Sequence, residues 1–112
     1  MLKRKKKSPR RSKIVPVRIS VDPHSGILQC VPEVVYIQRG DGVQWVTDEG
    51  ESLTIQSIAG TPFDKTEYHF PPNSIIQVRT DAEPGAYRFA SAVTFEGSVY
   101  MDARCPRLII DL

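Results

Sequence analysis

Short stretches in which apolar and polar residues alternate constrain this chain more than any other feature. The first covers residues 14–22, where Val15, Val17, Ile19 and Val21 occupy every second position. A period of two places one set of side chains on the buried face of a strand and the other set in water. Pro and Gly recur so often that no dozen residues keep the spacing of an amphipathic helix. The sequence therefore predicts an all-β domain.

Further stretches of this kind follow along the chain, with turn residues between them. They lie at residues 27–30, 34–38, 43–46, 53–58, 68–70, 74–79, 86–90 and 107–112. Residues 39–42 are expected to form a tight hairpin turn, with positive φ at Gly40 and Gly42. Short strands at regular spacing with turn signals between them predict an antiparallel sandwich or barrel, here of about 7–8 strands.

The first thirteen residues differ in composition from the rest of the chain. They contain no acidic residue and eight of the 15 basic ones, namely Lys3, Arg4, Lys5, Lys6, Lys7, Arg10, Arg11 and Lys13. Residues 14–112 keep seven basic residues against all 13 acidic ones, a net charge of −6. Eight like charges with so little apolar surface cannot form a core. The sequence predicts a disordered basic tail at residues 1–13 and one domain at residues 14–112.

The eight basic tail residues are the candidates for binding a polyanion or a partner. A basic side chain that neutralises a phosphate releases a counterion, and near an anionic lipid surface each contributes about 1 kcal/mol. Nucleic acid, the ribosome, an anionic membrane and an acidic protein surface all fit this chemistry, as does a solvated tail that binds nothing. No long apolar run follows the charges, so we expect no secretory signal, no transmembrane segment and a cytoplasmic protein, with peripheral membrane association left open.

The order of the later motifs resembles that of the cupredoxins, the blue-copper, plastocyanin-like β-sandwich family. The GDGVQW segment at residues 40–45 is similar to an early signature of that family, and the PGAYRF segment at residues 84–89 is similar to its penultimate core strand. Phe63 in the long middle loop and the final apolar strand also fit. The resemblance implies a Greek-key β-sandwich over residues 14–112, with the large rings of these segments directed inward.

The residues that the resemblance implies as copper ligands are absent. A blue-copper centre takes two histidines, a cysteine thiolate and a weak axial ligand. The resemblance places the first histidine at residues 48–52 and the cysteine at Ser91, with the second histidine in the loop that follows. Residues 48–52 and 92–104 contain no histidine. Only Met101 could serve as the axial ligand, and a thioether alone does not hold Cu(II), so we expect no metal and no cofactor.

Other groups of polar residues give no stronger site. His24 and His69 are expected at the surface or at an edge. Asp48, Glu49 and Glu51 are expected to form a solvated acidic loop. Ser91 has no histidine near it in the sequence, and a nucleophile without a base is weak. We therefore expect a protein that is not an enzyme.

Two cysteines, Cys30 and Cys105, lie far apart in the sequence and lack the short C-x-x-C spacing of metal sites. Because no export signal is seen, both are expected to be buried, reduced thiols. A disulfide between them is the alternative, and closing so long a loop would stabilise the fold by up to about 4 kcal/mol.

These observations favour a copper-free, cupredoxin-like interaction domain. It would be a subunit of a larger assembly that docks to a protein complex, or to a polyanion through its tail. Three alternatives remain. A divergent electron carrier would bind copper stoichiometrically, a nucleic-acid or ribosome-associated protein would act through the tail, and a small enzyme would use the loops near Ser91.

Overall fold

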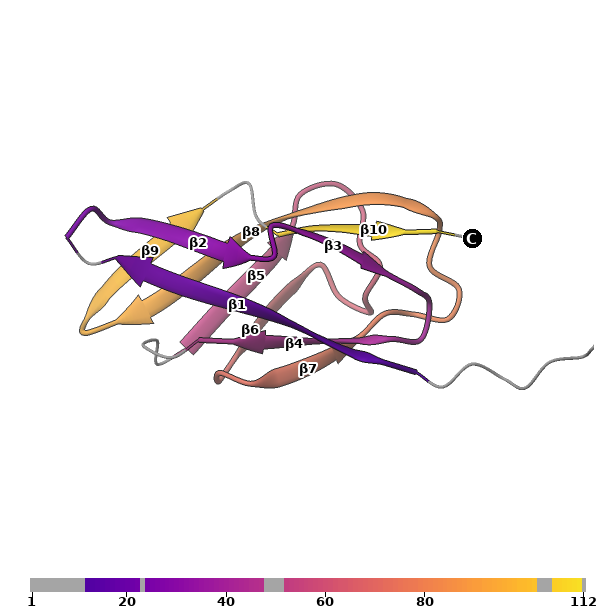
Figure 1. Ribbon diagram of the computed structural model, residues 1–112, viewed down its shortest axis with the longest axis horizontal. Helices are drawn as coiled ribbons and strands as arrows, with labels where there is room; N and C mark the ends of the chain where they lie inside the picture. Colours follow the sequence, from indigo (N-terminus) through magenta and orange to yellow (C-terminus); the bar gives the residue numbers. More distant parts are fainter. Residues whose placement is uncertain (1–11, 23, 48–51, 103–105, 112) are drawn as a thin grey trace, which may run out of the picture.

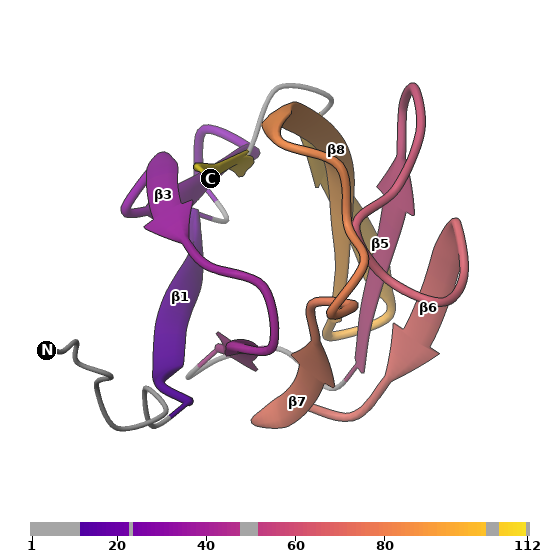
Figure 2. The same ribbon diagram turned by 90° about the vertical axis from the view of Figure 1, so that its right-hand side faces the viewer.

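The computed structural model describes residues 12–22, 24–47, 52–102 and 106–111. They form ten strands in two sheets that face each other (Figures 1 and 2). None of the described residues belongs to a helix that could cross a membrane. The strands are β1 (Ile14–Asp22), β2 (Ile27–Val31), β3 (Val34–Ile37), β4 (Gly42–Val46), β5 (Ser52–Ser57), β6 (Glu67–Phe70), β7 (Ser74–Gln77), β8 (Gly85–Phe95), β9 (Ser98–Asp102) and β10 (Arg107–Ile110). The all-β sandwich is confirmed, with ten strands where about 7–8 were predicted.

The two sheets have different sizes and mixed strand directions. One has the order β2-β1-β4-β7, and the other has the order β3-β10-β8-β5-β6 with β9 beside β8. The first half of β8 pairs with β10, and its second half pairs with β9. Most pairs are antiparallel, but β1 pairs with β4 and β10 pairs with β3 in parallel. Both parallel pairs join strands that are distant in sequence, so turn signals alone could not reveal them.

Residues 39–42 carry the chain from β3 in one sheet to β4 in the other, so the hairpin predicted there is wrong. Gly40 has the expected positive φ, 85°, which glycine adopts without strain. Gly42 is needed for a different reason, because a Cβ at this position would lie 2.8 Å from Cγ2 of Ile75. A side chain at Gly42 would therefore require the side chain of Ile75 on β7 to move.

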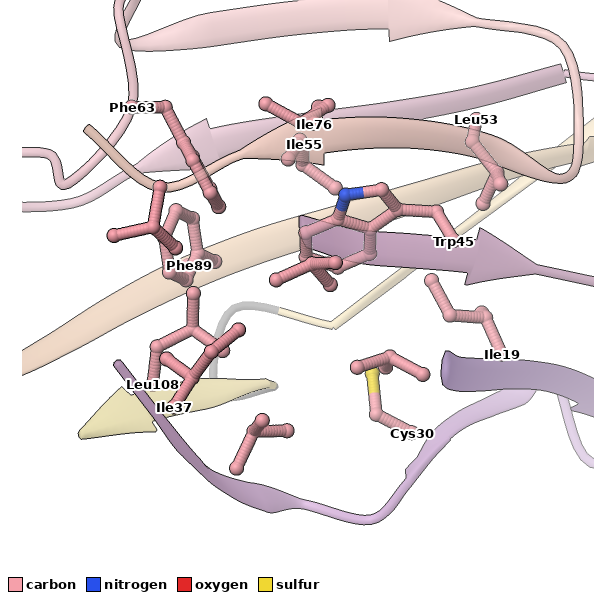
Figure 3. Packing of buried hydrophobic residues seen from close by; sticks show 14 of the residues in the cluster. Ile19, Cys30, Ile37, Trp45, Leu53, Ile55, Phe63, Ile76, Phe89 and Leu108 are labelled. Carbon is pink, nitrogen blue, oxygen red and sulfur yellow. The ribbon is translucent and has the colours of Figure 1, made fainter. Parts of the chain in front are cut away.

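The core lies between the sheets and is built from the inward positions of the alternating strands. Trp45, Phe63 and Phe89 are fully buried, and the ring centroid of Phe89 lies 6.2 Å from that of Trp45 and 5.6 Å from that of Phe63 (Figure 3). Aromatic contacts of this kind add to the free energy of burial. Tyr87 packs against the core and donates its hydroxyl proton to the carbonyl of Glu83. Nε1 of Trp45 is buried and has no hydrogen-bond partner among the described residues. The rings expected inside the sandwich are thus found there.

Cys30 lies in the core, on the inward face of β2 (Figure 3). It is disulfide-bonded. The sequence contains one other cysteine, Cys105, which lies outside the described residues. The reduced thiol expected at Cys30 is therefore wrong. Inward-facing positions suit a thiol and a disulfide equally well. The alternation of apolar and polar residues therefore could not predict whether Cys30 is reduced or disulfide-bonded.

The turn between β1 and β2 lies where the sequence predicts one, between the alternating stretches at residues 14–22 and 27–30. The carboxylate of Asp22 accepts a hydrogen bond from the backbone N–H of His24 (3.0 Å), and the Asp22 carbonyl accepts one from Gly26 (2.8 Å). The hydrogen bond from His24 lowers the pKa of Asp22 below its usual value, because it stabilises the ionised carboxylate. Gly26 has a φ of 74°, so this turn uses the conformational freedom of glycine.

Candidate functional site

The basic tail joins the domain at a fixed point. Of its eight basic residues, Lys13 is exposed directly before β1, whereas the other seven lie outside the described residues. The backbone N–H of Lys13 donates to Oδ1 of Asp41 (3.0 Å), and the Lys13 carbonyl accepts from the N–H of Gly42 (2.8 Å). The last residue of the tail is therefore bound to the start of β4.

Asp41 is the buried acid at this junction, with 2% of its surface exposed. Its Oδ2 accepts from the N–H of Gln38 (3.1 Å), and its carbonyl accepts from the N–H of Val78 (2.8 Å). Hydrogen bonds from backbone N–H groups to a carboxylate are charge-assisted and stronger than neutral ones. Asp41 therefore holds together the start of β1 and the segments that follow β3 and β7. Sequence analysis missed this role, because an aspartate between two glycines is equally typical of an exposed turn.

Ser91, which the resemblance aligns with the copper-binding cysteine, lies in the middle of β8. The strand was predicted to end at residue 90, but the alternation of inward positions continues and β8 extends to Phe95. Ser91 is 1% exposed and pairs with Ile55 of β5 on one side and with Asp102 of β9 on the other. Its side chain faces the core, from a strand that is hydrogen-bonded along both edges.

A two-residue turn stands where the resemblance places the loop with the second histidine. Phe95 pairs with Ser98, and Glu96 and Gly97 between them have φ values of 50° and 78°. Positive φ at both central residues is typical of a type I′ hairpin. The strand after it, β9, was not predicted. A two-residue turn ending in glycine between two alternating stretches was the signal that could have revealed it.

Met101, the candidate axial ligand, lies on the opposite face of the sheet from Ser91. Met101 pairs with Ala92, whereas Ser91 pairs with Asp102. Neighbouring residues on a strand project to opposite faces, so Ser91 faces the core and Met101 faces outward, where it is 69% exposed. The two side chains cannot share a metal ion while this ladder is intact. Residues 48–51, the region of the first histidine and of the acidic loop, lie outside the described residues.

Both histidines lie on the outside of the domain, as predicted. His24 is exposed in the turn after β1, and His69 is exposed on β6, where its Nδ1 is hydrogen-bonded to the hydroxyl of Thr54. Thr54 pairs with His69, and the next residue, Ile55, pairs with Ser91. His69 and Ser91 therefore occupy opposite faces of the sheet. Within the described ranges, no group of three His, Cys, Asp or Glu side chains is placed to hold a metal ion.

Comparison with known proteins identifies the fold. No family model matches the sequence, and no curated protein matches it. Among solved structures, the chain is similar to a pseudoazurin from Sinorhizobium meliloti, with a TM-score of 0.52. The two are 16% identical over 89% of this chain and 75% of the pseudoazurin chain. At this identity the similarity shows the fold alone, which is a cupredoxin-like β-sandwich.

Proposed function

We propose that the chain is a non-enzymatic, copper-free cupredoxin-like domain that docks to a partner, with the basic tail as its docking arm. The β8–β9 ladder, which separates Ser91 from Met101, is the observation that carries the copper-free assignment. The docking assignment is supported by the charge distribution, because eight basic residues precede a body with a net charge of −6.

The residues at the ligand positions do not fit a blue-copper ion. Such a centre needs the soft, negatively charged sulfur of a thiolate and two imidazoles. Ser91 supplies a hydroxyl on the core side of β8, and residues 48–52 and 92–104 supply no histidine. The alternative of a divergent copper-binding electron carrier is therefore not favoured.

The disulfide-bonded state of Cys30 bears on where the domain acts. Disulfides persist in oxidising compartments and are rare in the cytosol, where thiols are kept reduced. The cytoplasmic location expected from the sequence is difficult to reconcile with this bond. We therefore propose that the domain works in an oxidising compartment.

Copper binding provides a direct test of the copper-free assignment. The full chain, mixed with one equivalent of Cu(II) and desalted, is expected to remain colourless and to retain far less than one copper per chain by elemental analysis. The control is the double variant His24→Gln/His69→Gln, which removes both exposed imidazoles. Weak, colourless binding that disappears in this variant is surface binding and agrees with the proposal. Stoichiometric copper with an intense visible charge-transfer band would contradict it.

Docking through the tail is tested by affinity capture from extracts of the source cell. The full chain is compared with a tail-neutral variant, in which all eight basic tail residues are replaced by glutamine. We expect the partner to be captured by the full chain, to dissociate as salt rises, and to be lost with the tail-neutral variant, because salt screens charge attraction. A partner retained equally by both chains would show that the tail is not the docking arm.

A further inference from the structure

Two arginines lie side by side on the outer face of the larger sheet. Arg107 of β10 and Arg88 of β8 are directly opposite each other in the antiparallel ladder, and both are exposed. Opposed residues have Cβ atoms about 4.5–5.5 Å apart, and like charges on directly opposed residues are destabilising. Glu33 and Asp102 line a hollow together with Arg107, yet no described residue forms an ion pair with either arginine. The pair is therefore left without a counter-charge from the part of the chain that is described.

An exposed ring and two aliphatic side chains adjoin these arginines. Tyr36 of β3 pairs with Ile109 of β10, which pairs with Ala86 of β8, so the three form the next row on the same face. Tyr36 is 71% exposed, more than any other large apolar side chain of the described residues. We call these five residues the arginine–tyrosine patch: Tyr36, Ala86, Arg88, Arg107 and Ile109.

The chemistry of this patch suits a protein partner that carries carboxylates. Tyrosine and arginine are the residue types enriched at the energetic centres of protein interfaces. A guanidinium group binds a carboxylate through two parallel hydrogen bonds, and a carboxylate placed between Arg88 and Arg107 would remove their repulsion. All five residues lie on paired strands, so the patch is ordered before a partner arrives.

A single-stranded nucleic acid fits this face less well. Proteins that bind single strands without sequence preference stack successive bases on several exposed rings. Tyr36 is the one exposed aromatic ring among the described residues, because Tyr68, Tyr87 and Tyr100 are half-buried against the core. One ring is insufficient for a stacking surface.

We propose that the arginine–tyrosine patch binds an acidic segment of a partner protein. Carboxylates of the segment would lie on Arg88 and Arg107, and an apolar side chain would lie beside Tyr36 and Ile109. This inference rests on the proposed docking function and names the class of partner. The patch adds a rigid second contact to that of the tail, and two linked contacts on one partner raise the affinity through effective concentration.

The test is an NMR titration of the ¹⁵N-labelled full chain with a synthetic peptide of eight glutamates flanking a central leucine. We expect saturable shift changes at the N–H groups of Tyr36, Arg88 and Ile109, both in the wild-type chain and in the tail-neutral variant. In the tail-neutral background, Arg88→Gln and Arg107→Gln are each expected to weaken peptide binding about tenfold. Arg18→Gln, an exposed arginine on β1 of the other sheet, is the matched control and should leave binding unchanged.

Each other result has a defined meaning. Shift changes confined to residues 1–13 would contradict binding at the arginine–tyrosine patch and would still agree with docking through the tail. If no shift changes occur at all, binding at the patch is contradicted, and the result also argues against an acidic partner for the tail. Tighter binding of a single-stranded oligonucleotide at the same N–H groups would overturn the assignment to protein. Because Arg88→Gln removes one of two repelling charges, the melting temperature of this variant should equal or exceed that of the wild-type protein. A clear fall would contradict the argument from repulsion.

Discussion

Replacing Cys105 with alanine is expected to lower the free energy of unfolding by about 4 kcal/mol. Cys30 is disulfide-bonded, and Cys105 is the one other cysteine of the sequence. A bond between them closes a loop of roughly 75 residues, which restricts the unfolded chain and stabilises the fold by about this amount in the chain-entropy model. Urea unfolding of the oxidised wild type and of Cys105→Ala measures the difference.

Reductant provides the internal control for this prediction. It is expected to lower the urea midpoint of the wild type and to leave that of Cys105→Ala unchanged. The substitution keeps the buried sulfur of Cys30 in the core, so the loss does not arise from a cavity at that position. Equal stability of the oxidised wild type and the variant would contradict the prediction. Labelling thiols in protein taken directly from the source cell tests the oxidising compartment, because a disulfide-bonded chain takes up no label before reduction.

Replacing Asp41 with alanine is expected to cost about 3 kcal/mol of unfolding free energy. The substitution removes both carboxylate oxygens and leaves the N–H groups of Lys13 and Gln38 without their acceptors. Hydrogen bonds to charged groups contribute about 1.5–3 kcal/mol each. Asp41→Asn keeps one oxygen and nearly the same shape, so its expected cost is smaller, about 1–2 kcal/mol. Thermal or urea denaturation measures both.

Asp81→Asn is the matched control for Asp41. Asp81 forms an ion pair with Arg79 at 3.4 Å, but its side chain is 84% exposed. Exposed ion pairs contribute about 0–1 kcal/mol, so this substitution should change stability little. If Asp41→Asn and Asp81→Asn lowered the free energy of unfolding equally, the burial of Asp41 would not be the reason for its contribution to stability. In Asp41→Ala, the amide resonance of Lys13 should also move towards its random-coil position, which would show that the root of the tail has been released.

The alternation of residues was sufficient to predict most strands, because each strand buries one face and exposes the other. Residues 14–22 illustrate this, since Val17 and Ile19 are fully buried and Arg18 between them is exposed. The end of β8 and the whole of β9 were missed for a different reason. The resemblance implied a ligand loop after Ser91, although the local pattern of residues 91–95 continued the strand.

The features that bear most on function depend on contacts between distant segments. Asp41 is buried because the start of β1 and the segments after β3 and β7 come into contact around it. No local sequence pattern predicts these contacts. Arg88 and Arg107 become neighbours only through the register of β8 against β10. That register is determined by how the apolar faces of the two strands pack in the core. The charges of the tail, in contrast, are visible in the sequence but give no indication of which partner they meet.

The pairing of β1 determines how the domain responds to tension on its tail. Force entering at Lys13 runs along β1, whose first half pairs with β4 and whose second half pairs with β2, with five residue pairs in each ladder. The hydrogen bonds to β2 lie across the strand axis and those to the parallel strand β4 are slanted to it, so a pull along β1 loads both ladders in shear and does not open them one bond at a time. The Lys13–Asp41 hydrogen bond adds an attachment at the point where the force enters. Tension on the tail would therefore have to break the hydrogen bonds of both ladders together before β1 could leave the sheet.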